Sequence, residues 1–238
     1  MLKLAGSFDA ARSEAEALRF FDGHGVARLL DAEVERRALM MERLFPGRPL
    51  SRLGNEEAAT SASIAVLRAL PSGLPPDDVF PRLPDRALEL AGTLVPRFEA
   101  AGRPFHEQLV REAGALLDEL SAPVAEQAVL HGDLHRGNVL AGRGGWVAVD
   151  PSPLLGDRAY DAGAMLRDDP EAVLAAASAV AMLRRRLDRA CAELGLDRDR
   201  VRGWGQVQLV AHALERFEIR DRNRAEVFLA CAQIVAAL

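Results

Sequence analysis

A polar loop in the middle of the chain contains the residues with the clearest chemical meaning. Residues 131–138 have the sequence HGDLHRGN, and residues 147–150, VAVD, follow after a glycine-rich turn. Asp133 and Asn138 lie five residues apart between two predicted strands, and the hairpin brings Asp150 to the same end as Asn138. One carboxylate can then orient a substrate hydroxyl, while an amide and a second carboxylate offer oxygen ligands to Mg²⁺. Phosphoryl transfer needs this set of groups.

The context of this motif decides between two interpretations of it. The spacing of a histidine, an aspartate and an asparagine arises by chance in about one chain in a hundred. A polar turn whose Asp133 and Asn138 cap local backbone groups is the competing interpretation. A strand-like stretch precedes the motif, a hairpin follows it, and Asp150 ends that hairpin. This combination favours the catalytic interpretation.

The elements that position this loop differ between the two parts of the chain. The first 44 residues read as a small strand-containing piece, in which a helix separates one strand from two antiparallel strands. The helix is rich in good helix formers and is followed by two glycines. These elements are predicted over residues 1–4 (strand), 9–21 (helix), 26–30 (strand) and 38–44 (strand).

The remaining residues, 45–238, read as a mainly helical body with a small β insert at 128–150. Apolar residues recur at helical spacing on both sides of a proline-rich loop. Asp169 and Pro170 are a start signal for a long helix that stops at Gly195. Helices are predicted over residues 55–70, 85–101, 104–120, 158–167, 169–195, 199–217 and 222–238, and strands over 128–131, 139–141 and 146–149.

Composition limits the classes of function. The 238 residues include 30 basic and 35 acidic side chains, a net charge of −5, and 5% aromatic residues, which argues against a nucleic-acid partner. Lys3 is the only lysine. The two cysteines form no CxxC pair, and the longest apolar stretch, 172–183, is too short to span a membrane. With no signal peptide at the start, a cytoplasmic protein without membrane contact is expected.

Two longer stretches carry a resemblance to a known family. HGDLHRGNVL (131–140) with AVDPSPLLGDRAYDAGAMLR (148–167) resembles the aminoglycoside phosphotransferases, and within them the streptomycin 6-phosphotransferase and aminoglycoside/hydroxyurea resistance kinase branch. Residues 14–30 and 38–50 resemble that branch's helix–strand junction and interlobe hinge. The resemblance implies an α+β protein-kinase-like fold with two lobes. The small β-containing N-terminal lobe and hinge would comprise residues 1–44, and the mainly helical C-terminal lobe residues 45–238.

The resemblance implies roles in phosphoryl transfer for five residues. Asp133 matches the catalytic aspartate that orients the substrate hydroxyl, and Asn138 and Asp150 match the two Mg²⁺ ligands. Lys3 matches the strand lysine that contacts the phosphates of ATP. Glu14 is the best match for the helix glutamate that pairs with this lysine, and Glu16 is the second choice.

Further positions match supporting parts of the family pattern. Glu42 to Leu44 match the hinge whose backbone would bind adenine, with ATP and GTP both open as donors. Asp157 and Asp161 match a motif beyond the metal site that is expected to support the catalytic loop. His131 is expected to anchor the loop structurally, not to act as an acid or base.

The sequence also departs from the family pattern. Two strands and a phosphate-covering loop are expected before the lysine strand, whereas Lys3 is here the third residue, and Ser152 stands where a lysine is expected. We therefore expect weak ATP binding and a mobile N-terminal lobe. The leading hypothesis is an ATP- and Mg²⁺-dependent O-phosphotransferase acting on a hydroxyl of a small molecule such as a streptomycin-like aminoglycoside. The alternative is a catalytically impaired, kinase-like ligand-binding protein.

Overall fold

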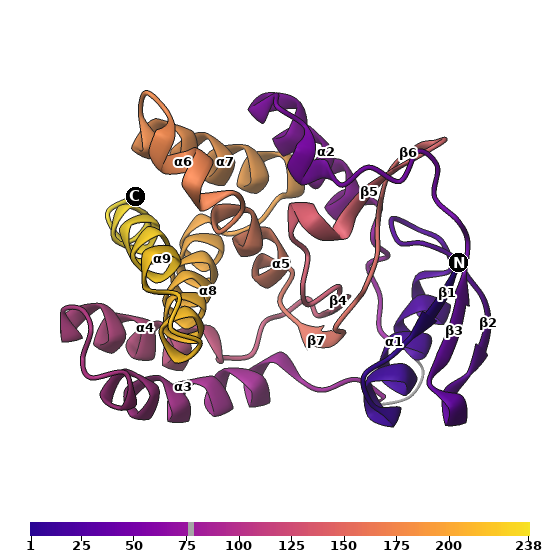
Figure 1. Ribbon diagram of the computed structural model, residues 1–238, viewed down its shortest axis with the longest axis horizontal. Helices are drawn as coiled ribbons and strands as arrows, with labels where there is room; N and C mark the ends of the chain where they lie inside the picture. The colour runs from indigo at the N-terminus through magenta and orange to yellow at the C-terminus, as the bar shows by residue number, and fades with distance from the viewer. Residues whose placement is uncertain (76–78) are drawn as a thin grey trace. The chain divides into compact units, whose positions relative to one another are not determined.

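The computed structural model describes residues 1–75 and 79–238, and its backbone contacts divide the chain into two compact units (Figure 1). The first unit comprises residues 1–81 and 126–161, and the second comprises residues 82–125 and 162–238. The two lobes expected from the resemblance, 1–44 and 45–238, stay a prediction. No helix of the described residues is long and apolar enough to cross a membrane.

An antiparallel three-stranded sheet and one helix begin the first unit. Apolar residues of the helix recur on one buried face, which includes Leu18 and Phe21, and Ser7 caps its start by accepting a hydrogen bond from the amide of Ala10. The strand order is β1-β3-β2, and Lys3 lies opposite Leu39. The elements are β1 (Leu2–Leu4), α1 (Phe8–Phe21), β2 (Leu29–Glu33) and β3 (Ala38–Met41).

The strand predicted over residues 26–30 is shifted in the structure to Leu29–Glu33. Val26 forms a parallel bridge with Ala148, and the amide of Ala27 donates to the carbonyl of Ala148 at 2.8 Å. The apolar start of the predicted strand therefore connects the segment after α1 to the hairpin that follows the loop 131–138. The polar residues that follow pair with β3 instead, because an edge strand tolerates exposed charges.

The other described residues of the first unit form one complete helix, the start of another and two pairs of antiparallel strands. β4 pairs with β7 and β5 pairs with β6 (Figure 1). β7 was not expected from the sequence, because it has three residues and follows two prolines. Asn55 caps α2 and Glu56 lies in its first turn. The elements are α2 (Glu56–Ala69), β4 (Ala128–Leu130), β5 (Val139–Gly142), β6 (Gly145–Ala148), β7 (Leu154–Gly156) and α5 (Ala159–Gly163), which crosses the boundary between the units.

The second unit consists of helices packed on one another. α8 is buried along most of its length, with Trp204 at 1% exposure, and it packs extensively against α9. Arg97 of α3 donates to both carboxylate oxygens of Glu218 at 2.6 and 3.0 Å, which joins α3 to the end of α8. The helices are α3 (Leu83–Ala100), α4 (Glu107–Leu120), α6 (Pro170–Ala175), α7 (Ala179–Leu194), α8 (Arg198–Glu218) and α9 (Arg222–Ala236).

Two helix predictions in this region were wrong in detail. The long helix predicted over 169–195 is interrupted between α6 and α7, where Ala176 is extended and Ser178 caps α7 by accepting from the amide of Ala181 at 3.2 Å. A serine that competes for backbone hydrogen bonds favours a new helix start over a continuous helix. The helix predicted over 158–167 is α5 followed by a 3₁₀ turn.

Two glycines allow the end of α5 to approach α8 closely. A Cβ at Gly163 would lie 2.8 Å from the backbone nitrogen of Gly205, and a Cβ at Gly205 would lie 2.6 Å from a methyl carbon of Leu166. A larger side chain at Gly163 would require the helices to move, because the nearest atom is backbone, whereas the atom nearest to Gly205 is the end of a flexible side chain.

We predict that Gly163→Ala lowers the free energy of unfolding by about 1–3 kcal/mol, because the added methyl group overlaps backbone that cannot rotate away. Urea unfolding followed by circular dichroism measures the change. Gly114→Ala is the matched control, since no atom lies within 4 Å of its added Cβ in α4, and it should stabilise by up to about 1 kcal/mol. Equal effects of the two substitutions would contradict the close contact.

Candidate functional site

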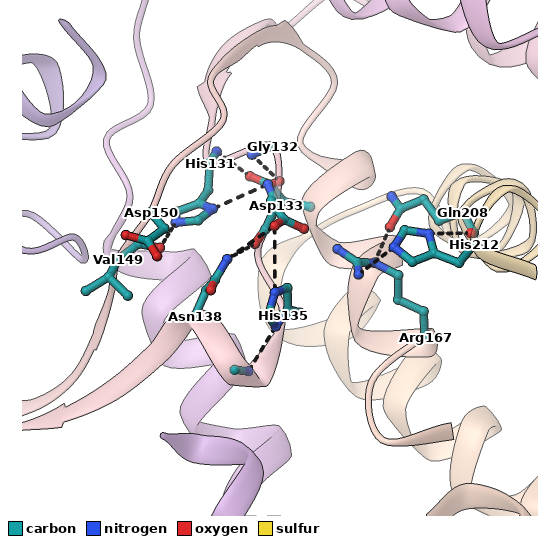
Figure 2. Close-up of polar contacts among 12 residues, drawn as sticks. His131, Gly132, Asp133, His135, Asn138, Val149, Asp150, Arg167, Gln208 and His212 are labelled. Carbon is teal, nitrogen blue, oxygen red and sulfur yellow. Dashed lines mark hydrogen bonds and ion pairs between the residues drawn. The ribbon is translucent and has the colours of Figure 1, made fainter. Parts of the chain in front are cut away.

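The polar loop 131–138 connects β4 to β5 and ends beside the residue that follows β6. Val139 lies opposite Ala148 in the hairpin, and the amide of Val149 donates to the carbonyl of Asn138 at 2.8 Å. The hairpin register therefore brings Asn138 and Asp150 to the same end, as the sequence predicts (Figure 2). Asp150 has a left-handed backbone, with φ of 59°.

Asp133 and Asn138 are joined directly within the loop. The Asn138 amide nitrogen Nδ2 lies 3.0 Å from the Asp133 carbonyl oxygen and 3.3 Å from its carboxylate oxygen Oδ2. His135 Nε2 lies 3.7 Å from the same carboxylate oxygen, while His135 Nδ1 accepts from the amide of Gly137 at 3.0 Å. The Asp133 side chain is 44% exposed. The carboxylate is thus oriented by its neighbours and still accessible to a ligand.

The groups that could hold a metal ion are the amide oxygen of Asn138 and the carboxylate of Asp150. The Asn138 nitrogen is used in the contacts to Asp133, whereas its oxygen has no hydrogen-bond partner among residues 1–75 and 79–238. The Asp150 side chain is 48% exposed. The described residues contain no cluster of three or more His, Cys, Asp or Glu side chains suited to a metal. Two oxygen ligands fit Mg²⁺, which binds few protein groups and takes the others from water and phosphate.

Asp161 holds the start of the loop. Its buried carboxylate accepts the amides of His131 at 2.7 Å and Gly132 at 2.9 Å. Gly132 has φ of 79°, and a Cβ there would lie 1.7 Å from the carbonyl oxygen of Ser152. The loop can therefore enter its turn only with glycine at this position.

Asp157, the other predicted supporting residue, accepts from the amide of Ala159 at 2.9 Å, at the start of α5. Ser152, which stands where the family pattern has a lysine, donates its amide to the carbonyl of His131 at 2.8 Å. Its backbone therefore contributes to the loop, and its side chain is too short to replace the lysine ammonium.

His131 is fully buried beneath the loop. Its Nε2 lies 3.0 Å from the carbonyl oxygen of Val149, so Nε2 carries the proton, and Nδ1 lies 3.4 Å from the amide nitrogen of Asp133. Burial lowers the pKa of the His131 imidazole to about 4, although the Val149 carbonyl opposes this shift. The ring is neutral at pH 7 and joins β4, the loop and the end of β6.

Lys3 and Glu14 form an ion pair that also reaches Asp150. Lys3 Nζ lies 2.7 Å from both carboxylate oxygens of Glu14 and 3.0 Å from Asp150 Oδ1. Burial raises the pKa of the Glu14 carboxyl, while its contact with Lys3 opposes that shift. Burial alone would lower the pKa of the Lys3 ammonium. The hydrogen bonds to Glu14 and Asp150 outweigh this effect, so that the pKa of the ammonium is raised. Glu16, the second choice, pairs with Arg19 at 2.8 Å instead.

The predicted hinge follows β3 directly. The backbone amide of Glu42 donates to the carbonyl of Arg28 at 2.9 Å, and its carboxylate accepts from the Arg28 amide at 2.8 Å. The amides of Arg43 and Leu44 donate no hydrogen bond to any residue that the structure describes. Of the three hinge residues, Arg43 and Leu44 are therefore the two with backbone donors available to a ligand.

Arg136 is a part of the site that the sequence analysis missed. Its side chain is 4% exposed, and its guanidinium donates to both carboxylate oxygens of Glu56 at 2.8 and 3.1 Å and to the hydroxyl of Thr60 at 3.1 Å. This contact joins the catalytic loop to α2. No local pattern identifies it, because Glu56 is 80 residues away.

A second polar cluster lies wholly within the second unit and was also not predicted. Arg167 Nε donates to the side-chain oxygen of Gln208 at 3.0 Å, and Arg167 Nη1 lies 3.2 Å from His212 Nε2. His212 Nδ1 lies 2.9 Å from the backbone oxygen of Gln208 (Figure 2). Because arginine can only donate, His212 Nε2 accepts and the imidazole is neutral.

We predict that His131 makes stability depend on acid pH. The imidazole of the unfolded chain has a pKa near 6.5 and that of the folded chain about 4, so the unfolded state binds more protons between these values. Stability is complete above pH 6.5 and falls by about 3 kcal/mol as the pH drops to 4. Urea unfolding of the wild type and of His131→Gln across this range measures the effect. A decline equally steep in the variant would contradict it.

Comparisons with known proteins identify the family of the chain. A family model described as aminoglycoside/hydroxyurea antibiotic resistance kinase matches residues 1–216. The streptomycin 6-kinase of Streptomyces glaucescens is 34% identical over 231 residues, which cover 94% of this chain and 72% of that protein. The hydroxyurea phosphotransferase of Kitasatospora aureofaciens is 33% identical over 242 residues, which cover 98% of this chain and 67% of that protein.

The crystal structure of a choline/ethanolamine kinase family protein from Mesorhizobium loti matches 98% of this chain and 81% of its own, with a TM-score of 0.66 at 16% identity. At that identity the match speaks for the fold alone, and the fold is the protein-kinase-like α+β fold expected from the sequence. Sequence matches over most of the chain decide the family. The chain belongs to the aminoglycoside/hydroxyurea antibiotic resistance kinase family.

Proposed function

We propose that the chain transfers the γ-phosphate of ATP, with Mg²⁺, to a hydroxyl of a small molecule, and that the acceptor is a streptomycin-like aminoglycoside. The observation that carries this proposal is the grouping of Asp133, Asn138, Asp150 and Lys3 at the open end of one hairpin. In-line phosphoryl transfer needs an oriented hydroxyl, oxygen ligands for a cation and a positive charge near the phosphates.

Asp133 would accept the hydrogen bond of the attacking hydroxyl. Its carboxylate is restrained by Asn138 and His135, and the side chain is 44% exposed. The hydroxyl oxygen would thereby be held in line with the γ-phosphorus atom of ATP. The hydroxyl proton would point towards Asp133, away from that phosphorus atom. Orientation of this kind accounts for a large share of the rate in phosphoryl transfer, which needs little covalent help from the protein.

Asn138 and Asp150 would hold Mg²⁺ through the amide oxygen and one carboxylate oxygen. The bound cation supplies charge neutralisation across the phosphate oxygens. Lys3 would donate from Nζ to the phosphates, and Glu14, which stays buried behind it, would keep the ammonium in place. The amides of Arg43 and Leu44 are the donors that adenine would use.

The acceptor class rests on the relatives. Two of them are named for streptomycin and hydroxyurea, and an aminoglycoside offers several hydroxyl groups. The presence of the loop residues and of the Lys3–Glu14 pair supports the phosphotransferase proposal over the impaired-kinase alternative. Incubation with ATP, Mg²⁺ and either streptomycin or hydroxyurea, followed by product mass, tests the acceptor. A mass gain of one phosphate on hydroxyurea alone would overturn the aminoglycoside assignment.

We expect Asp133→Asn to lower kcat by about 10²–10⁴-fold, because an amide at this position cannot accept the hydroxyl proton and orients the hydroxyl less well. The affinity for ATP, measured by calorimetry, should change by less than about twofold, since Asp133 would contact the acceptor and not the nucleotide. Asp9→Asn, at an exposed position in the first turn of α1, is the control and should retain full activity. An undiminished kcat in the Asp133 variant would refute the role.

We expect Lys3→Met to raise the KM for ATP and to lower kcat, because charge-assisted hydrogen bonds to the phosphates are lost. The ratio kcat/KM should fall by about tenfold or more. The variant also leaves Glu14 buried without its cation and should be less stable. The double variant Lys3→Met/Glu14→Gln separates the two effects. Its Tm should return towards that of the wild type, whereas its KM for ATP should stay raised. Recovery of both would assign Lys3 a structural role only.

A further inference from the structure

Two segments of the first unit carry exposed arginines and lack acidic residues. Residues 43–55 contain three arginines, and residues 139–149 contain one, Arg143, with no Asp or Glu in either segment. The whole chain has more acidic than basic residues, 35 against 30. A local surface of one sign in a chain of the opposite sign attracts ligands of complementary charge.

The two segments form one surface, because they are hydrogen-bonded to each other. The amide of Gly47 donates to the carbonyl of Ala141 at 2.9 Å, and the amide of Ala141 donates to the carbonyl of Arg48 at 2.9 Å. Pro49 and Leu140 form the next bridge along this contact. The segment after the hinge therefore runs antiparallel beside β5, joined to it by an isolated bridge and two backbone hydrogen bonds.

A groove of about 650 Å³ opens along this segment and is lined by Gly47, Arg48, Pro49 and Arg52. We call it the arginine groove. Both arginines are exposed. Arg43 precedes the groove in sequence, and Arg143 lies in the turn between β5 and β6.

The arginines here lack the counter-ions that others have. Arg97, Arg103 and Arg111 each pair with a glutamate within 3.0 Å. Arg48 and Arg52, by contrast, form no ion pair or side-chain hydrogen bond with any of the residues 1–75 and 79–238, and the same is true of Arg43 and Arg143. Neighbouring guanidinium groups repel one another, so an anion between them would relieve this repulsion.

We propose that the arginine groove binds a soluble small molecule that carries at least two phosphate groups. A guanidinium presents paired N–H donors that match phosphate oxygens, and two of them line the groove. Pro49 and the backbone bonds to β5 hold the segment in place, which lowers the ordering cost of binding. The concave shape favours a discrete ligand over a flat lipid surface. This site uses none of the residues of the proposed phosphoryl-transfer reaction and does not depend on that proposal.

The experiment is a calorimetric titration of the full chain with inorganic pyrophosphate, without Mg²⁺. Arg48→Gln/Arg52→Gln should weaken binding by about tenfold or more, because hydrogen bonds to charged groups are lost. Its circular-dichroism spectrum and its Tm should stay unchanged, which shows that the variant is folded. Arg184→Gln is the matched control, since Arg184 is an exposed arginine in α7 without a described partner, and its affinity should stay within about twofold.

Two further measurements separate this site from other anion sites. Lys3→Met should bind pyrophosphate as tightly as the wild type, because the groove does not include Lys3. Raising the salt from about 0.01 to about 0.1 M, which shortens the Debye length from about 30 to about 10 Å, should weaken binding in the wild type.

Four outcomes would overturn the proposal. The first is that pyrophosphate does not bind the wild type at low salt, and the second is that Arg184→Gln loses as much affinity for pyrophosphate as the groove variant. The third is that Lys3→Met loses affinity for pyrophosphate while the groove variant does not. The fourth is that the chain binds anionic lipid vesicles but not pyrophosphate. The third would place the pyrophosphate at the nucleotide phosphates, and the last would indicate a membrane surface.

Discussion

The candidate site depends on one buried carboxylate, which fixes how the catalytic loop begins. Asp161 accepts the amides of His131 and Gly132, and these two donors would be left unsatisfied in the interior without it. Gly132 in turn permits the approach of the Ser152 carbonyl, so that β4, β7 and the loop meet at one point. The direction of Asp133 follows from that junction, since it is the next residue. The position of Asp133 is therefore set by a buried carboxylate and by a close approach of two backbone segments.

The loop is held at its other end by a different kind of contact. Arg136 and Glu56 form a buried bidentate pair, and the hairpin bond from Val149 to Asn138 adds a third attachment. A loop fixed at both ends loses little conformational freedom when a ligand binds. Little of the binding energy is therefore used to order the loop. The Lys3 ammonium is fixed in a similar way before any ligand binds, because the buried Glu14 carboxylate holds it while it stays partly exposed.

Local sequence signals predicted the site better than its supports. The spacing of Asp133, Asn138 and Asp150 is fixed by a hairpin, and a hairpin register follows from short-range geometry. Asp161 was found only because it belongs to a family pattern, and the Glu56–Arg136 pair was missed because its partners are far apart in sequence. For the fold, helix positions were mostly correct, whereas β7 and the interruption of 169–195 were not. Three-residue strands carry no periodicity, and one capping serine can end a helix that composition alone would continue.

The rarity of lysine in this chain gives the Lys3–Glu14 contact a practical consequence. Lys3 is the only lysine, so it carries the only side-chain amine. The hydrogen bonds that raise the pKa of its ammonium also slow its reaction with acylating reagents, which require the neutral amine. Apart from the α-amino group, such a reagent therefore modifies the chain at a single position beside Asp150. The extent of labelling then reads out directly whether a nucleotide shields that ammonium.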